Sequence, residues 1–155
     1  MKNKATLLLS LLLISPLNFS QEREQEIIVK DYYPNAVYGS LGIGGLYFTA
    51  TGFYERTLSY NGRLRTFAKV GVGGYALWGI GGVYGMGHLG LLTGANNNHL
   101  ELSAGYNRFF TGDLQGDYPL SGTMGYRFQK PDGLFIFRTG VSFPEAVYLG
   151  LGFSF

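Results

Sequence analysis

The C-terminal half of the chain alternates apolar residues with small or polar ones at a period of two. In the last segment the apolar positions are Val147, Leu149, Leu151, Phe153 and Phe155. The segments 99–107, 120–129 and 134–143 repeat this pattern of one apolar face and one small or polar face. Because successive side chains of a strand point to opposite faces, each segment predicts a β-strand with a single apolar face.

Four earlier strands are predicted at residues 36–44, 46–59, 63–77 and 79–93, where frequent glycine interrupts the alternation. Asn61-Gly62 predicts a two-residue hairpin turn, because both residues tolerate positive φ. Because eight is an even number, antiparallel strands would bring the start and the end of the barrel segment of the chain to the same side. The turns at 60–63, 94–98 and 130–133 would then be short and would lie on the side that holds these two ends of the chain. The loop at 110–118 would be longer and lie on the other side.

The composition decides which face meets the surroundings. Charged residues make up 14% of the chain, against about 25% in ordinary soluble domains. Aromatic residues make up 16%, and 25 residues are glycine. Aromatic residues also fall near strand ends, at Tyr60, Tyr118, Phe128, Phe143 and Phe155. Lipid around the barrel would remove the need for a charged exterior. Residues 36–155 are therefore predicted to form an all-β, eight-stranded antiparallel up-and-down transmembrane barrel.

The first twenty residues have the order of a secretory signal. Lys2 and Lys4 precede an apolar run from Leu7 to Ile14, and Ser20 offers a small residue for cleavage. Residues 21–35 then read as a polar periplasmic lead-in. An uncleaved N-terminal anchor is the alternative, although the apolar run is too short to span a bilayer as a helix.

A transmembrane helix is the competing interpretation of residues 70–100. This stretch has no Asp, Glu, Lys or Arg and is long enough to span a bilayer. Its many glycines each cost a helix about 1 kcal/mol relative to alanine. The glycines also leave no helical apolar stripe, so strands are favoured.

The composition and the glycine patterns argue against several kinds of site and partner. The chain has no cysteine, which excludes disulfides, thiolate metal sites and a lipidated N-terminal cysteine. Without Lys2 and Lys4 the net charge of +2 falls to zero, so no nucleic-acid partner is expected. Two dinucleotide-type glycine patterns begin at Gly71 and Gly85. Neither precedes a helical pattern, so no cofactor is expected.

Two patches carry a resemblance to a known group of proteins. One is Gly125-Tyr126-Arg127-Phe128-Gln129-Lys130-Pro131-Asp132-Gly133 with the aromatic run to Arg138. The other is Asn35 to Thr57, with Gly44-Gly45-Leu46-Tyr47 and Tyr54-Glu55-Arg56. Both patches resemble hairpins of uncharacterised small outer-membrane β-barrel proteins of Gram-negative bacteria. The resemblance implies an outer-membrane location and no particular activity. It also implies that the barrel assembly machinery reads the C-terminal strand through Phe153 and Phe155.

Five charged residues are expected inside the barrel, because their parity places them opposite the apolar face. They are Glu55, Lys69, Glu101, Arg127 and Arg138. Charges in a narrow, poorly hydrated lumen need partners, which predicts a structural salt-bridge plug. The functional alternative is a gated or substrate-binding polar core.

Catalysis has one candidate constellation. His99, Glu101 and Ser103 share a strand face and have the residue types of a hydrolytic triad. Their parity places them in the lumen, where a lipid ester has poor access. His88 and His99 alone give no third ligand for a metal site.

The favoured function is a non-enzymatic outer-membrane barrel with a lumen filled by side chains. Its expected partners are outer-membrane lipid and the assembly machinery, and its role is structural or one of surface contact through the 110–118 loop. An outer-membrane lipid-modifying hydrolase is the first alternative. A soluble periplasmic barrel that carries an apolar ligand is the second.

Overall fold

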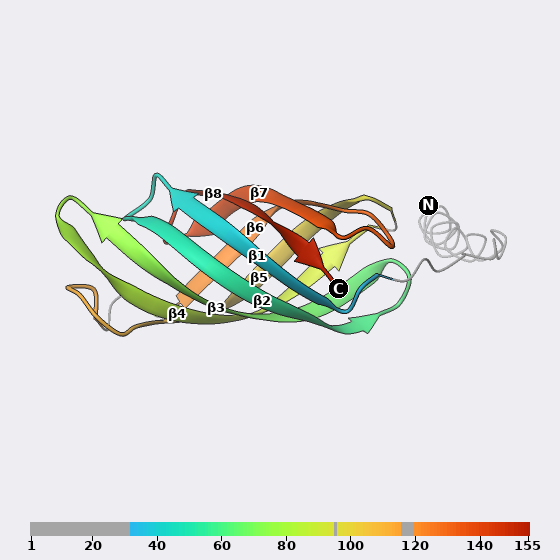
Figure 1. The fold of residues 1–155 in the computed structure, drawn as a ribbon, viewed down its shortest axis with the longest axis horizontal. Coiled ribbons are helices and arrows are strands. Elements are labelled where there is room, and N and C mark those ends of the chain that lie inside the picture. Colours follow the sequence, from blue (N-terminus) through green and yellow to red (C-terminus); the bar gives the residue numbers. More distant parts are fainter. Residues whose placement is uncertain (1–31, 95, 116–119) are drawn as a thin grey trace, which may run out of the picture.

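The chain forms a single closed barrel of antiparallel strands (Figure 1). This computed structural model describes residues 32–94, 96–115 and 120–155. The strands are β1 (Asn35–Ile43), β2 (Phe48–Tyr60), β3 (Leu64–Leu77), β4 (Ile80–Thr93), β5 (Asn98–Phe109), β6 (Leu120–Gln129), β7 (Phe135–Phe143) and β8 (Val147–Ser154). Each strand pairs with its neighbours in sequence, and β8 pairs with β1. The predicted all-β, eight-stranded antiparallel architecture is confirmed.

Closure of the barrel leaves no free sheet edge. Ala36 lies opposite Ser154 at one end of the β1–β8 ladder, and Ile43 lies opposite Val147 at the other. Beyond the ladder, the backbones of Asn35 and Phe155 exchange two hydrogen bonds, of 3.1 and 2.9 Å. Every strand therefore has two hydrogen-bonded neighbours.

The two faces of the strands divide as the alternation predicts. On β8 the outward-facing apolar side chains Leu149, Leu151 and Phe153 are exposed, whereas Tyr148 and Ser154 are buried. The same alternation holds on β5, where Glu101 and Ser103 are buried between exposed leucines. The stretch 70–100 lies in β3, β4 and the start of β5, so it is not a helix.

The turns lie at the ends of the barrel where the sequence predicts them, although the turn at Asn61-Gly62 differs in its conformation. The turns at 60–63, 94–98 and 130–133 lie at the end of the barrel that also holds Tyr32 and the C-terminus (Figure 1). The loop between β5 and β6 lies at the opposite end, and residues 110–115 of it are described. The other turns at that end are short.

The expected two-residue turn at Asn61-Gly62 is wrong. Three residues separate β2 from β3, and only Gly62 among them has positive φ, at 83°. Asn61 instead turns the chain with its side chain, because its Oδ1 accepts a hydrogen bond from the backbone N–H of Leu64 at 2.8 Å. The true two-residue turn is Trp78-Gly79, between β3 and β4.

The proposed signal at residues 1–20 and the lead-in up to residue 31 lie outside the described residues, as does Tyr118. Within the described part, no helix is long and apolar enough to cross a membrane.

Candidate functional site

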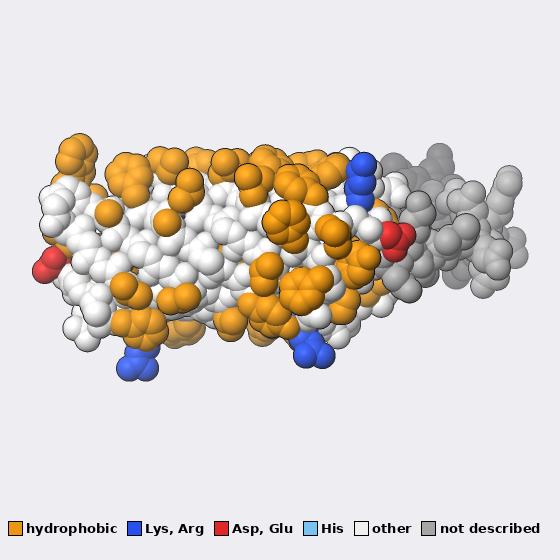
Figure 2. Space-filling view, viewed as in Figure 1, with side chains coloured by type: hydrophobic (Ala, Val, Ile, Leu, Met, Phe, Trp, Pro, Cys, Tyr) orange, Lys and Arg blue, Asp and Glu red, His pale blue; other side chains and the backbone are white. Residues whose placement is uncertain are grey.

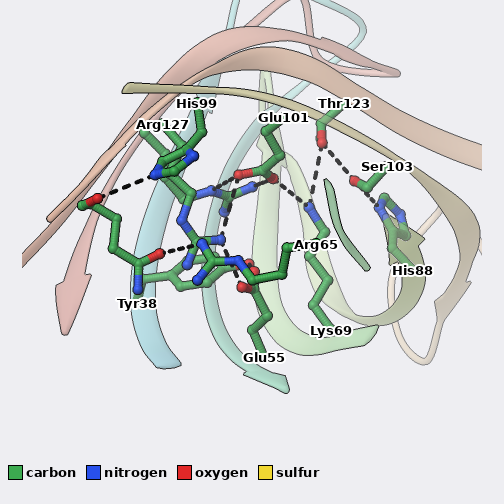
Figure 3. Close-up of polar contacts among 12 residues, drawn as sticks. Tyr38, Glu55, Arg65, Lys69, His88, His99, Glu101, Ser103, Thr123 and Arg127 are labelled. Carbon is green, nitrogen blue, oxygen red and sulfur yellow. Dashed lines mark hydrogen bonds and ion pairs between the residues drawn. The ribbon is translucent and has the colours of Figure 1, made fainter. Parts of the chain in front are cut away.

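A cluster of charged side chains occupies the middle of the barrel interior (Figure 3). Its members come from five strands and are Glu55, Lys69, Glu101, Arg127 and Arg138. All five are buried, with exposed fractions of 2% or less. Their parity on each strand turns them away from the apolar outer face, and the diameter of an eight-stranded barrel lets them meet. We call this set the charge cluster.

Three of the four ion pairs in the charge cluster join strands that are not neighbours in the sheet. Arg127 Nη1 lies 2.6 Å from Glu55 Oε1, and Lys69 Nζ lies 3.5 Å from Glu101 Oε1. Arg138 binds both carboxylate oxygens of Glu101, and its Nε lies 2.8 Å from Oε2. Arg127 Nη1 also lies 3.8 Å from Glu101 Oε2. The Arg127–Glu55 pair therefore crosses the lumen between β6 and β2, and the Glu101 carboxylate links β5 to β3, β6 and β7.

Aromatic rings complete the packing around the guanidinium groups. The guanidinium carbon of Arg138 lies 4.2 Å from the ring centre of Tyr38 and 5.4 Å from that of Tyr148. Tyr38 also donates a 3.0 Å hydrogen bond to Glu55 Oε2. Stacking on aromatic faces stabilises a desolvated cation, so these contacts help the ion pairs to offset their desolvation.

Next to the charge cluster, a chain of hydrogen bonds runs through His88. Lys69 Nζ donates to the Thr123 hydroxyl at 3.4 Å, and that hydroxyl lies 2.7 Å from Ser103 Oγ. Ser103 Oγ lies 3.1 Å from His88 Nδ1, and His88 Nε2 lies 2.6 Å from Ser121 Oγ. This group could not be predicted from the sequence, because its members lie on four different strands.

The two ends of this chain have a definite direction. An ammonium group can only donate, and Ser121 donates to Asn107 Oδ1 at 2.7 Å. Because the Ser121 hydroxyl has one proton, its oxygen accepts from His88 Nε2. Both ring nitrogens of His88 therefore have a hydroxyl partner.

The expected catalytic trio does not assemble around His99. His99 Nδ1 and Nε2 face the backbone oxygens of Thr93 and Gln129, at 3.1 and 3.2 Å. The carboxylate of Glu101 binds cations, and Ser103 contacts His88 instead. Positions i and i+4 of a strand are about 13 Å apart, so a shared face does not bring His99 to Ser103. His99 has no nitrogen free to act as a base toward that hydroxyl.

Further layers of side chains fill the lumen on both sides of the charge cluster. Toward the 110–118 loop lies an aromatic cluster of Tyr47, Tyr75, Tyr84 and Phe109. Toward the termini, Arg65 donates to Gln129 Oε1 at 2.7 Å and lies 4.5 Å from the ring centre of Tyr32. Tyr32 packs edge-on against His99. No open passage is expected through three such layers.

One small cavity remains between the charge cluster and the aromatic cluster. Its volume is about 30 Å³, room for roughly two water molecules. Arg138 and Lys69 line one part of it, and Glu145 and Tyr84 line another. Thr49 donates to the Glu145 carboxylate at 3.1 Å. A cavity of this size admits water but no organic substrate.

The remaining predicted features take ordinary structural positions. Phe153 and Phe155 project outward at the end of the last strand, with exposed fractions of 60% and 53%. The glycine patterns that begin at Gly71 and Gly85 lie within β3 and β4. In the described ranges, no three His, Asp or Glu side chains gather as a metal site would require.

Comparisons of the chain with protein families, curated proteins and solved structures found no match.

Proposed function

We propose that this chain is a bacterial outer-membrane β-barrel with a closed lumen, and that its role is structural or one of surface contact. The observation that carries this proposal is the inverted polarity of the barrel. Ion pairs and polar networks lie inside it, and large apolar side chains project from its outside, one face of which Figure 2 shows. A barrel that is soluble in water buries its apolar face, so the reverse arrangement favours lipid.

The outward face of the strands carries almost no charge. Across the eight strands, only two outward-facing residues carry charge, Arg56 on β2 and Arg108 on β5. Exposed apolar residues surround the barrel, among them Val37, Val72, Leu89, Met124 and Leu151. Soluble monomers rarely expose contiguous apolar patches larger than a few hundred Å².

The apolar band has the height that a bilayer requires. On β5, the outward-facing positions between Asn98 and Arg108 are Leu100, Leu102, Ala104 and Tyr106. Ten residues at about 3.4 Å each, with a tilt near 45°, rise by roughly 24 Å. Outer-membrane barrels present an apolar band of about 25 Å.

The filled interior favours a structural role over the alternatives. A lipid-modifying hydrolase would need a nucleophile that lipid can reach, and Ser103 is buried at 3% exposure. A carrier of apolar ligands would need a large apolar cavity, whereas the described cavity is small and the charged residues Lys69, Arg138 and Glu145 line part of it. The 110–118 loop would then make the contacts at the cell surface. Residues 1–20 would direct export, and Phe153 and Phe155 would present the last strand to the assembly machinery.

The test is to express the full chain in a Gram-negative host and fractionate the envelope. We expect a band in the outer-membrane fraction that needs detergent for extraction and migrates faster in gels when it is not boiled. A chain that stays in the aqueous periplasmic fraction without detergent would contradict the proposal and favour a soluble barrel.

A further inference from the structure

The turn between β3 and β4 places a tryptophan where the backbone disfavours it. Trp78 has φ of 39° and Gly79 has φ of 95°. These two positive values form the tight turn for which Asn-Gly is the preferred pair. Positive φ is an outlier for a bulky side chain and is retained where something outside local sterics favours the residue.

Among the described residues, no packing contact accounts for this tryptophan. Trp78 is 95% exposed, the largest value among the exposed large hydrophobic residues. The last β2–β3 pair is Phe48 with Ala76, and the first β4–β5 pair is Tyr84 with Phe109. The tip therefore extends beyond both neighbouring strands, and Figure 1 shows this hairpin (green) projecting at the end opposite the termini.

The height of Trp78 relative to the apolar band follows from the strand register. Arg56, the outward charge on β2, pairs with Ala68 on β3. From Ala68 to Trp78 the outward positions carry no charge, and ten residues again rise by roughly 24 Å. Arg56 and Trp78 thus mark the two edges of the band on this side of the barrel. The tip itself, residues 77–82, carries no charge.

We propose that Trp78 anchors the projecting β3–β4 hairpin in the headgroup region of the lipid bilayer. The inference rests on the proposed membrane location and adds to it the partner of this hairpin, a lipid surface. The indole ring is largely apolar with one N–H donor, and tryptophan gathers at membrane interfaces for this reason. Contact with lipid offsets the unfavourable turn conformation, and the anchor fixes how deeply the tall β3–β4 side of the barrel sits.

Trp78 is the only tryptophan in the chain, so its fluorescence reports on this site directly. The full chain would be folded into phosphatidylcholine vesicles that contain lipids brominated at known depths, with iodide as the aqueous quencher. We expect blue-shifted emission, strongest quenching by bromine near the headgroups and weak quenching by iodide. Emission as in water with full quenching by iodide, from a barrel that still needs detergent for extraction, would overturn the anchor alone. A chain that remains in solution apart from the vesicles would overturn both proposals.

Substitution at position 78 gives a second test, in which the direction of the change in the urea midpoint of unfolding distinguishes the two outcomes. Trp78→Asn creates the preferred Asn-Gly turn, so relief of backbone strain alone would raise the urea midpoint of unfolding. We expect a lower midpoint in vesicles because the lipid contact is lost, and a midpoint close to that of the unsubstituted chain for Trp78→Tyr. A higher midpoint for Trp78→Asn would show that lipid does not hold this residue.

Discussion

Glu101 is the residue whose environment depends most on a single charge. It is fully buried at 0% exposure, and Arg138, Lys69 and Arg127 all lie within ion-pair distance of its carboxylate. Loss of the negative charge would leave three desolvated cations with only Glu55 as a counter-charge in the charge cluster. Removing one partner of a buried pair costs more than the pair contributes, because the remaining charge stays desolvated.

Glu101→Gln is therefore expected to lower the free energy of unfolding by about 3–5 kcal/mol. Urea titration of the barrel in lipid vesicles would measure this loss. Asp113→Asn is the matched control, because Asp113 is exposed in the β5–β6 loop and its change is expected to stay within about 0.5 kcal/mol. Equal effects of the two substitutions would argue against a structural role of the charge cluster.

At the scale of the element, β4 shows how interior glycines permit the packing. Gly90 lies opposite Phe67 on β3, and both positions face the lumen. The Phe67 ring lies directly over Gly90, where an added Cβ would collide with three ring carbons. Gly87 lies on the outer face of the same strand, and a Cβ there would meet nothing within 4 Å. Glycine is thus required at one position and replaceable at the other.

The two glycines provide a matched pair of substitutions. Gly90→Ala is expected to destabilise the barrel by about 1–3 kcal/mol, because the buried ring must move in a filled lumen. Gly87→Ala should be neutral or stabilising by up to about 1 kcal/mol, since it restricts the unfolded chain without a clash. Thermal unfolding followed by the gel shift between folded and unfolded bands would compare them. Destabilisation by Gly87→Ala alone would contradict the assignment of faces.

At the scale of the whole molecule, the barrel encloses three stacked layers of side chains. The aromatic cluster lies toward the 110–118 loop, the charge cluster lies in the middle, and Arg65 with Gln129 lies toward the termini. An eight-stranded barrel leaves just enough interior for side chains. The lumen is therefore a packed core that contains both charged and aromatic layers.

We expect no steady ion conductance from the purified barrel in a planar bilayer. The described cavity of about 30 Å³ has room for roughly two water molecules, and the charge cluster and the aromatic cluster lie on its two sides. Single-channel recording would check this, with a general diffusion porin as the positive control in the same bilayer. Stable current steps at low voltage would contradict a closed lumen and favour a gated polar core.

Much of the architecture could be predicted because a strand has a side-chain period of two. The strand predicted at 63–77 is observed at Leu64–Leu77, and the one predicted at 79–93 is observed at Ile80–Thr93. The same period assigned the charge cluster to the face opposite the apolar one. The conformation of the turns was predicted less accurately. Asn61 turns the chain through its side chain and not through its own positive φ.

The sequence by itself determined which residues are strands, where the chain reverses and which face each side chain takes. Only the tertiary structure decided which interior side chains meet. Ser103 contacts His88, fifteen residues away, and not His99 on its own strand. The physical reason is that the period of a strand fixes a side chain's face but not its height in the barrel. Height depends on the register between strands and on the tilt that closes the barrel, and both arise only when all eight strands pair.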